Sequence, residues 1–300
     1  MPWFHIRSAG AAGKISIAFW DHWVPQGNVV MRQQVDEWAK KNMVQVTSDF
    51  ITSNGNKLLL TAAAEKQARA GHDAIHVSQW DVHNYRDALE PVDDVVQGLT
   101  AKYGAASSMC EYLAKIKGHW LAIPSSCGAQ TKPPCARISI LKQTAGIDVT
   151  EMYPTHPGYT PGMQEWTWEL HLKAAEAAAK IGKNFAIGLG QTSDSVDTAG
   201  SLFAAYGGEL VDAQGNIKAD SPEVHQVLEH AQKLVKFLPK EAVSFDDASN
   251  NRALISGQSA LIWNPPSAWA VAKRDAPAVA ADCWTFSAPS GPKGRFVPIN

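Results

Sequence analysis

Aromatic and acidic residues occur together at two places in the N-terminal part of the chain. Trp20, Asp21 and Trp23 form one group, and Trp80 and Asp81 form the other. A Trp ring covers the apolar C–H face of a polyhydroxylated molecule, while a neighbouring carboxylate accepts hydrogen bonds from its hydroxyl groups. Both groups therefore indicate binding of a carbohydrate or a similar polyol. The alternative for Asp81 is that it only caps the helix that follows.

Predicted strands precede both groups. Alternating apolar residues over 15–19 predict a strand that ends at Trp20, and the apolar run 74–77 predicts a strand before Trp80. A helix is expected between them over about 57–70. Alternating strands and helices predict a mostly parallel sheet, in which ligands bind at the carboxyl ends of the strands. We therefore expect both groups at one edge of the sheet.

The C-terminal part offers further candidate ligand contacts in similar positions. A predicted strand over 185–189 opens into a loop, and a strand-like run over 260–263 is followed by a Pro-rich loop. Polar groups at strand ends supply hydrogen-bond donors and acceptors, whereas the alternative is an ordinary capped turn. Trp rings are often core residues, which is the alternative for both Trp candidates. The candidates are Ser126, Gln191, Asp194, Asp197, Trp263, Asn264 and Trp269.

A segment rich in Ser, Gly and Pro over 124–134 suggests a crossing between two lobes, because Pro-Pro fits poorly in a helix or a central strand. We expect a strand to begin over 136–141. Thr167 is the predicted cap of a helix over 168–181. Ser221, with proline at the first helical position, is a strong start for another helix.

Composition excludes several classes of protein. The 300 residues are 45% hydrophobic, which suffices for one large or two medium globular units. The net charge of −2 combines 27 basic and 29 acidic residues without a basic stripe, so nucleic acid is not an expected partner. No apolar run reaches the roughly 20 residues that cross a bilayer. The first thirteen residues lack the apolar block of an export signal, so either the protein is cytoplasmic or its signal is missing.

Metal binding and catalysis have little support in the sequence. The four cysteines, at 110, 127, 135 and 283, lack the paired short spacing of zinc sites, and the histidines form no His-Glu-x-x-His pattern. A glycosidase needs two carboxylates at a defined separation, a role that Asp81 and Asp194 could share, but nothing singles them out. We expect no catalytic residues, no metal and no cofactor.

Several segments in a fixed order resemble one family. The chain is similar to the extracellular solute-binding proteins of ABC importers, in the carbohydrate-binding group that includes maltose-binding protein. The similarity covers essentially 14–300. The segments that carry it are 15–20, 71–73, 89–94, 120–124, 167–168, 206–208 and 256–261.

The resemblance implies an α/β fold of the type II periplasmic-binding-protein class, with two lobes joined by a hinge and a ligand cleft between them. Hinge closure around the ligand belongs to that class. In this family Asp81 matches the sugar-contacting acid, Trp269 a stacking aromatic, and the loop from Trp20 to Trp23 a ligand contact. Ser267 stands where maltose-binding protein has another stacking aromatic, which argues against a maltodextrin.

The resemblance also implies a division of the chain. We assign 1–13 to an N-terminal tail, 14–132 to the N-terminal lobe, 133–292 to the C-terminal lobe and 293–300 to the start of a return crossing. Related chains continue further, so we expect a chain truncated at both ends that lacks its export signal. Cys135 and Cys283 would lie on neighbouring strands, and we consider a disulfide between them.

The implied function is the substrate-binding subunit of an ABC importer, a periplasmic monomer. It would capture a sugar, oligosaccharide or sugar alcohol and deliver it to permease subunits in the membrane. Two alternatives stay open. One is a binding protein for another small solute such as a polyamine, because Trp rings around Asp81 also suit a cation. The other, from a different class, is a carbohydrate-active hydrolase.

Overall fold

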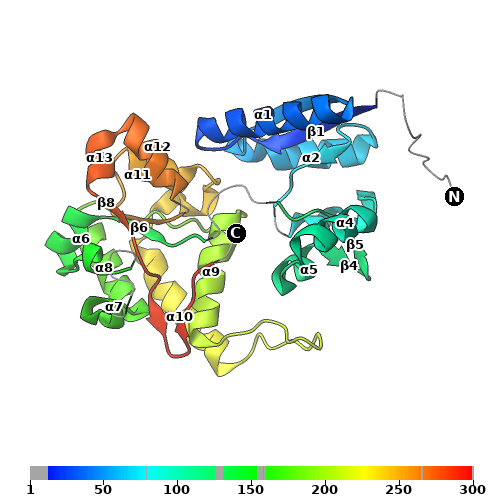
Figure 1. Cartoon of the computed structure of the whole chain (residues 1–300). Helices are drawn as coiled ribbons and strands as arrows, with labels where there is room; N and C mark the ends of the chain where they lie inside the picture. The colour runs from blue at the N-terminus through cyan, green and yellow to red at the C-terminus, as the bar shows by residue number, and fades with distance from the viewer. Residues whose placement is uncertain are drawn as a thin grey trace. The chain divides into compact units, whose positions relative to one another are not determined.

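The computed structural model describes residues 13–78, 80–125, 131–153, 158, 160–264 and 266–298. The chain forms two compact units, Met1–Ser125 (unit 1) and Ser126–Asn300 (unit 2). Figure 1 shows unit 1 in blue to teal and unit 2 in green to red. The observed boundary precedes the one that we expected between 132 and 133.

Unit 1 is built on a parallel sheet with the strand order β2-β1-β3, as the alternation of strands and helices predicted. The helix expected over 57–70 is α2, and the strand expected over 74–77 is shorter. The elements in chain order are β1 (Lys14–Trp20), α1 (Pro25–Asn42), β2 (Gln45–Ile51), η1 (Asn54–Asn56), α2 (Lys57–Ala68), β3 (Ala74–Ile75), α3 (Asp81–Tyr85), η2 (Arg86–Ala88), α4 (Asp93–Tyr103), α5 (Ser108–Ala114), β4 (Lys115–Ile116) and β5 (His119–Trp120).

Few side chains of unit 1 are fully buried. Ala18 in the central strand is 0% exposed, and a small cluster joins Val96, Ala114 and Trp120 beside the β4–β5 hairpin. The 18-residue helix α1 buries none of its side chains. The core of unit 1 is therefore thin.

Unit 2 has a three-stranded sheet with β6 in the centre, antiparallel to both β7 and β8. Its elements are β6 (Pro134–Arg137), α6 (Ile138–Ala145), η3 (Val149–Glu151), α7 (Pro161–Glu165), α8 (Trp168–Lys180), α9 (Ser193–Tyr206), α10 (Pro222–Leu234), η4 (Val235–Phe237), η5 (Lys240–Ser244), α11 (Ser249–Ile255), β7 (Leu261–Trp263), α12 (Ser267–Asp275), α13 (Pro277–Ala281), β8 (Cys283–Thr285), β9 (Ser290–Gly291) and β10 (Gly294–Arg295). The strand expected over 185–189 is reduced to one parallel bridge, between Ala186 and Ile262.

The expectation of a strand over 136–141 was wrong beyond Arg137, where α6 begins. The carboxylate of Asp282 caps this helix, because it accepts hydrogen bonds from the Ser139 backbone N–H at 2.8 Å and from the Ser139 hydroxyl at 2.6 Å. It also pairs with Arg137 at 2.8 Å. Pro134 begins the central strand, although we expected Pro-Pro to fit poorly there. Proline is tolerated at the first residue of a strand.

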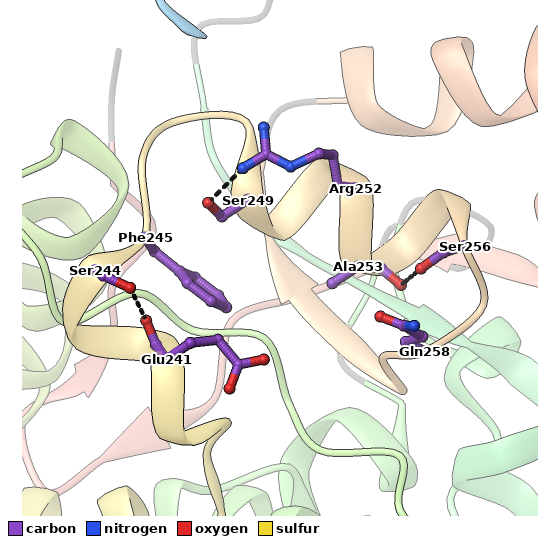
Figure 2. A pocket seen from close by; sticks show the side chains of 8 residues that line it. All are labelled: Glu241, Ser244, Phe245, Ser249, Arg252, Ala253, Ser256 and Gln258. Atoms are coloured by element: carbon purple, nitrogen blue, oxygen red, sulfur yellow. Dashed lines mark hydrogen bonds between the residues drawn. The ribbon is translucent and has the colours of Figure 1, made fainter. Parts of the chain in front are cut away.

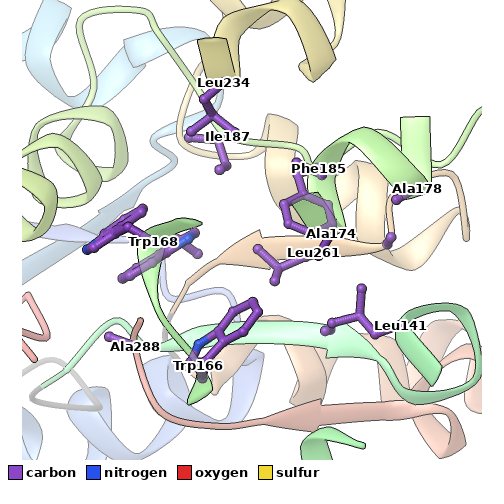
Figure 3. Close-up of a cluster of buried hydrophobic side chains, with 14 of the residues drawn as sticks. Leu141, Trp166, Trp168, Ala174, Ala178, Phe185, Ile187, Leu234, Leu261 and Ala288 are labelled. Carbon is purple, nitrogen blue, oxygen red and sulfur yellow. The ribbon is translucent and has the colours of Figure 1, made fainter. Parts of the chain in front are cut away.

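The predicted helix starts of unit 2 are confirmed. The Thr167 hydroxyl accepts a hydrogen bond from the Leu170 backbone N–H, and Ser221 accepts one from Val224. Figure 3 shows the core that these helices help to build, with Trp166, Trp168 and Phe185 all 0% exposed. Unit 2 therefore contains a dense aromatic core.

Cys135 and Cys283 lie on neighbouring strands as expected, but both are free thiols. Cys135 faces Thr285 across the ladder, and Cys283 faces Arg137, so the two cysteines form a diagonal pair. The two thiols are close enough to hydrogen-bond to each other, but the structure does not join them in the disulfide that we considered. Among the described residues, no helix is long and apolar enough to cross a membrane.

Candidate ligand-binding site

The carboxyl edge of the unit 1 sheet gathers all five predicted site residues of that unit. Trp20 is the last residue of β1, and Asp21 and Trp23 follow it directly. Trp80 and Asp81 follow β3, which pairs with β1 in parallel through Ala18 and Ile75. Since parallel strands end at the same edge, the two aromatic–acidic groups share it.

The first loop holds two Trp rings at a steep angle. The ring centroids of Trp20 and Trp23 lie 6.1 Å apart with their planes at 77°. The Trp20 indole N–H donates to the Ser53 hydroxyl at 3.2 Å, which fixes this ring against the loop after β2. Asp21 accepts from the Asn28 amide at 2.5 Å. Both rings are only partly buried and present faces on which a sugar ring can stack.

Asp81 combines burial with an unused hydrogen-bond acceptor. Its side chain is in the first turn of α3, and the residue is 6% exposed. One carboxylate oxygen accepts from the Asn84 amide at 3.1 Å, whereas the other, Oδ2, is buried and has no partner. An unpartnered buried acceptor costs about 1–3 kcal/mol. Among the described residues, the Asp81 carboxylate bonds to the Asn84 side chain and to no backbone N–H of α3, so it does not cap this helix.

In unit 2, Asp194 and Asp197 form a buried ion-pair cluster with Lys132. The Lys132 ammonium lies 3.1 Å from Asp194 Oδ1 and 2.7 Å from Asp197 Oδ2, and it donates to the Ser193 hydroxyl at 3.1 Å. Burial alone would lower the pKa of Lys132, but the two carboxylates outweigh it and raise that pKa. Burial raises the pKa of Asp197, and Lys132 opposes that change.

The same cluster extends to the predicted residue Asn264. The Asn250 amide donates to Asp194 Oδ2 at 2.8 Å and to the Trp263 carbonyl at 3.0 Å, and the Asn264 amide donates to Asn250 Oδ1 at 3.1 Å. Burial raises the pKa of the nearby Asp247 carboxyl to about 6, and the negative charge of Asp194 contributes to this rise. Three predicted residues, Asp194, Asp197 and Asn264, thus lie in one cluster, linked through Lys132 and Asn250.

The other candidates of unit 2 lie in different environments. Trp263 is 2% exposed and its ring stacks on Trp168 at 5.5 Å between centroids, so the structure places it in the core and not on a ligand surface. Trp269 on α12 is 38% exposed, with its indole N–H bonded to the Ala280 carbonyl and the Lys273 ammonium 5.2 Å from the ring centroid. Gln191 is exposed in the loop before α9. Ser126 lies outside the described residues.

A separate pocket of about 460 Å³ lies beside α11 (Figure 2). Its serine hydroxyls are already used, since Ser244 donates to the Glu241 carbonyl and Ser256 to that of Ala253. Arg252 donates to Ser249 and pairs with Asp246 at 2.9 Å. The residues that line this pocket include none of those predicted to bind the ligand.

Sequence reasoning missed Lys132 and Asn250. Lys132 precedes Pro133 and Pro134, a context typical of an exposed connection, and only its position immediately before a buried strand hinted at burial. Asn250 lies in an Asn-Asn pair, and no local sequence pattern indicated that it is buried in this cluster. Among the described residues, no group of histidines, cysteines and acids could hold a metal ion.

Comparison with solved structures supports the architecture. Thermotoga maritima MalE3 with bound maltose superposes with a TM-score of 0.69 and 16% identity, over 96% of this chain and 70% of that one. A sugar transporter from Arthrobacter chlorophenolicus with bound laminaribiose gives a TM-score of 0.71 and 16% identity, over 94% and 68%. At this identity the likeness shows the fold alone. The predicted two-lobed fold of the type II periplasmic-binding-protein class is thereby confirmed.

Sequence comparison identifies the family. A probable ABC transporter-binding protein of Deinococcus radiodurans is 24% identical over 305 residues, and the match covers 96% of this chain. The chain spans 66% of the length of that relative. The family model for bacterial extracellular solute-binding proteins matches residues 139–294, which is more than half of the chain. The protein therefore belongs to the family of bacterial extracellular solute-binding proteins, as its sequence segments indicated.

Proposed function

We propose that this protein is the substrate-binding component of an ABC importer and that it captures a sugar, oligosaccharide or sugar alcohol. The observation that carries this proposal is the carboxyl edge of the unit 1 sheet. Two angled Trp rings, Trp20 and Trp23, and the bare oxygen of Asp81 share that edge. Rings supply stacking faces and the carboxylate accepts a hydroxyl, which together match a polyol.

Family membership supplies the rest of the proposal. The protein acts outside the cytoplasm, in the periplasm, as a monomer that presents its ligand to permease subunits in the membrane. Contacts from both lobes that exist only in the closed state shift the open–closed equilibrium toward closure. The similar solved structures with bound maltose and with bound laminaribiose support a saccharide as the ligand class.

Hydrolysis is less well supported than binding. Of the two carboxylates that could have served a glycosidase, Asp194 accepts hydrogen bonds from Lys132 and Asn250. Both oxygens of this carboxylate therefore already accept a hydrogen bond from a protein side chain. The family is one of solute-binding proteins, and turnover of a glycoside by the pure protein would overturn this conclusion.

Thermal unfolding with a panel of sugars, polyols and polyamines tests the proposal. A ligand at a hundredfold its Kd adds about 2.7 kcal/mol to the free energy of unfolding. We expect one saccharide or polyol to raise the melting temperature. A rise with polyamines alone would assign a cationic solute to Asp81, and a cooperative melt that no compound moves would contradict the proposal.

A matched pair of Trp variants locates the site. Trp20→Ala should reduce the ligand-induced rise, because it removes a stacking face worth about 0.5–1.5 kcal/mol beyond its buried area. Trp38→Ala is the control, since Trp38 lies on α1 of the same unit and is 52% exposed. Equal loss in both variants would show that the effect arises from folding and not from ligand contact.

A further inference from the structure

Both ring nitrogens of His72 lie against carboxylates in unit 1. Nδ1 is 2.6 Å from Glu65 Oε1, and Nε2 is 3.1 Å from Asp49 Oδ2. An ionised carboxylate only accepts hydrogen bonds, and a neutral imidazole has a single N–H, so the neutral ring satisfies one of these contacts and not the other. The imidazolium donates at both nitrogens. The geometry therefore indicates a protonated His72, and we name these three side chains the His72 clasp.

The surroundings of His72 favour its charged form. Its side chain is 16% exposed, and burial alone would lower its pKa. The hydrogen bonds to Asp49 and Glu65 outweigh burial and raise the pKa of His72 above the usual 6.5. Hydrogen bonds from Ser16 lower the pKa of the adjacent Asp73 carboxyl, and the charge of His72 contributes to that change.

Gly71 leaves the room that the clasp needs. A Cβ at this position would lie 2.3 Å from Glu65 Cδ, so any other residue would displace the Glu65 side chain. Through Oε2, Glu65 also accepts the His72 backbone N–H at 3.1 Å. One carboxylate of α2 thus holds both the ring and the backbone of His72, and the glycine before it permits this close approach.

The clasp lies at the start of the segment that carries Asp81. Strand β3 follows it directly and has only two residues, both paired with β1. Side-chain bonds reinforce this short pairing, since Asp73 accepts from the Ser16 backbone N–H at 2.7 Å and from its hydroxyl at 2.8 Å. After the strand, the His76 backbone N–H donates to the Ala18 carbonyl at 2.8 Å. A two-residue strand therefore depends on the contacts at its ends.

Helix α2 holds the same segment again beyond β3. Lys66, the neighbour of Glu65, donates to the Asn84 carbonyl at 3.2 Å. The Asn84 amide in turn donates to Asp81 Oδ1 at 3.1 Å. The helix thus contacts the segment before the strand, through His72, and after it, beside Asp81. A shift of β3 against α2 would therefore move the Asp81 carboxylate.

We propose that His72 is a positioning residue for the candidate ligand site: its imidazolium, held between Glu65 and Asp49, fixes β3 against α2 and so fixes Asp81 at the sheet edge. His72 lies at the opposite end of β3 from Asp81 and acts through the strand. That this position serves ligand binding rests on the proposed function. The clasp itself is measurable without any ligand.

The clasp makes the order of β3 depend on pH. Well below pH 6.5 the His72 ring is protonated in folded and unfolded chains alike, and its contribution to the free energy of unfolding is fully present. As pH rises through the raised folded-state pKa, the ring loses a proton and one carboxylate contact, so this contribution is lost. Burial lowers the pKa of His76, the histidine after β3, so His76 is neutral over this range.

NMR of the full chain without ligand tests the proposal. Titration of the His72 ring signals should give a pKa above 6.5. The His76 amide reports the pairing of β3 with β1, and the Asp81 amide is bonded to the Ser78 carbonyl at 3.0 Å. Relative to intrinsic exchange at the same pH, the protection of both amides should fall about tenfold as pH rises through the His72 pKa.

Variants assign this pH dependence to the clasp. His72→Gln should give, at every pH, the low protection that the wild type shows at high pH. His119→Gln is the matched control and should leave both amides unchanged, since His119 lies 2.8 Å from Asp93 in the same unit but is 64% exposed. Asp49→Asn is a milder variant that keeps the Glu65 contact, because Asp49 is 58% exposed. It should lower the pKa of His72, and it serves as the test if His72→Gln does not fold.

Two results would overturn the inference. One is a His72 pKa at or below 6.5 in the wild type. The other is equal protection of the Asp81 amide in the wild type and in His72→Gln at low pH. The sugar panel can leave the melting temperature unmoved while the clasp is found, and a saccharide can bind while the clasp is absent. Failure of this inference and failure of the proposed function are therefore distinguishable.

Discussion

Unit 1 and unit 2 differ in how their helices are held. The longest helix of unit 1, α1, buries no side chain, whereas α8 of unit 2 buries Trp168, His171, Ala174, Ala175 and Ala178. The helices of unit 2 also have more side-chain caps than those of unit 1. In unit 2, α7, α8, α9 and α10 each have a Ser or Thr cap, whereas α5 is the capped helix among the described helices of unit 1.

The better-packed unit is therefore not the unit that carries the proposed stacking rings. The proposed ligand contacts Trp20, Trp23 and Asp81 belong to the unit with the thinner core. Regions with few buried apolar contacts open locally at low free energy. Ligand bound at the unit 1 edge should therefore protect that unit more than it protects the core of unit 2.

The largest expected effect is the loss of a core ring from unit 2. Trp168→Ala should lower the free energy of unfolding by about 3–5 kcal/mol, because Trp168 is 0% exposed and stacks on Trp263 at 5.5 Å. Trp38→Ala in unit 1 should change it by less than about 0.5 kcal/mol. Urea unfolding measures both, and a comparable cost for the two variants would remove the contrast between the units.

Two groups of unit 2, Asp247 and His171, should determine how the free energy of unfolding depends on pH. Burial raises the folded-state pKa of Asp247 to about 6, above its usual 3.8. Its contribution to the free energy of unfolding is therefore present at low pH and is lost as pH rises through 6. Burial lowers the pKa of His171 to about 3, so stability is lost as pH falls below its usual 6.5. Between pH 4 and 6 the two groups oppose each other.

Asp247→Asn separates these two contributions. It should raise the free energy of unfolding at pH 7 by about 1–3 kcal/mol, because a carboxylate that resists ionisation is removed. In the variant, stability should then fall more steeply than in the wild type as pH drops from 6 to 4. Urea unfolding across this range measures the difference. The exposed residue Asp87 of unit 1 provides the control, and Asp87→Asn should leave the profile unchanged.

The smallest expected effect concerns a helix cap. Thr167→Ala should cost about 1 kcal/mol, because the Thr167 hydroxyl accepts from the Leu170 backbone N–H at 3.2 Å. Val24, at the corresponding position of α1, makes no side-chain cap bond. Val24→Ala should therefore change stability far less. Equal costs by calorimetry would show that capping does not distinguish the units.

Local sequence signals predicted the parts of the fold that depend on neighbours in the chain. The caps Thr167 and Ser221 and the parallel sheet of unit 1 followed from patterns within a few residues. The start of α6 did not, because Asp282, a residue 145 positions from Arg137, supplies its cap. Contacts over such separations leave no local pattern.

The candidate site was predictable to a similar extent. Residue type and strand position placed the unit 1 group at one sheet edge, where the structure has it, and also selected Asp194 and Asp197; that these residues bind a ligand stays a prediction. They did not find Lys132, because a lysine beside two prolines is usually exposed. They could not place the Trp263 ring, since Trp at the end of a buried strand serves a core or a ligand surface equally well.

The central position of β6 has a consequence for how unit 2 forms. The partners of this strand are β7 and β8, which begin at Leu261 and Cys283, so the sheet cannot assemble until the ribosome has made almost all of the described chain. Pairing over such separations gives high contact order and slow folding. Unit 1, whose β1 and β2 are close in sequence, can fold while unit 2 is still being synthesised. Newly made chains should therefore pass through a state in which the apolar surface of β6 is uncovered and open to chaperones.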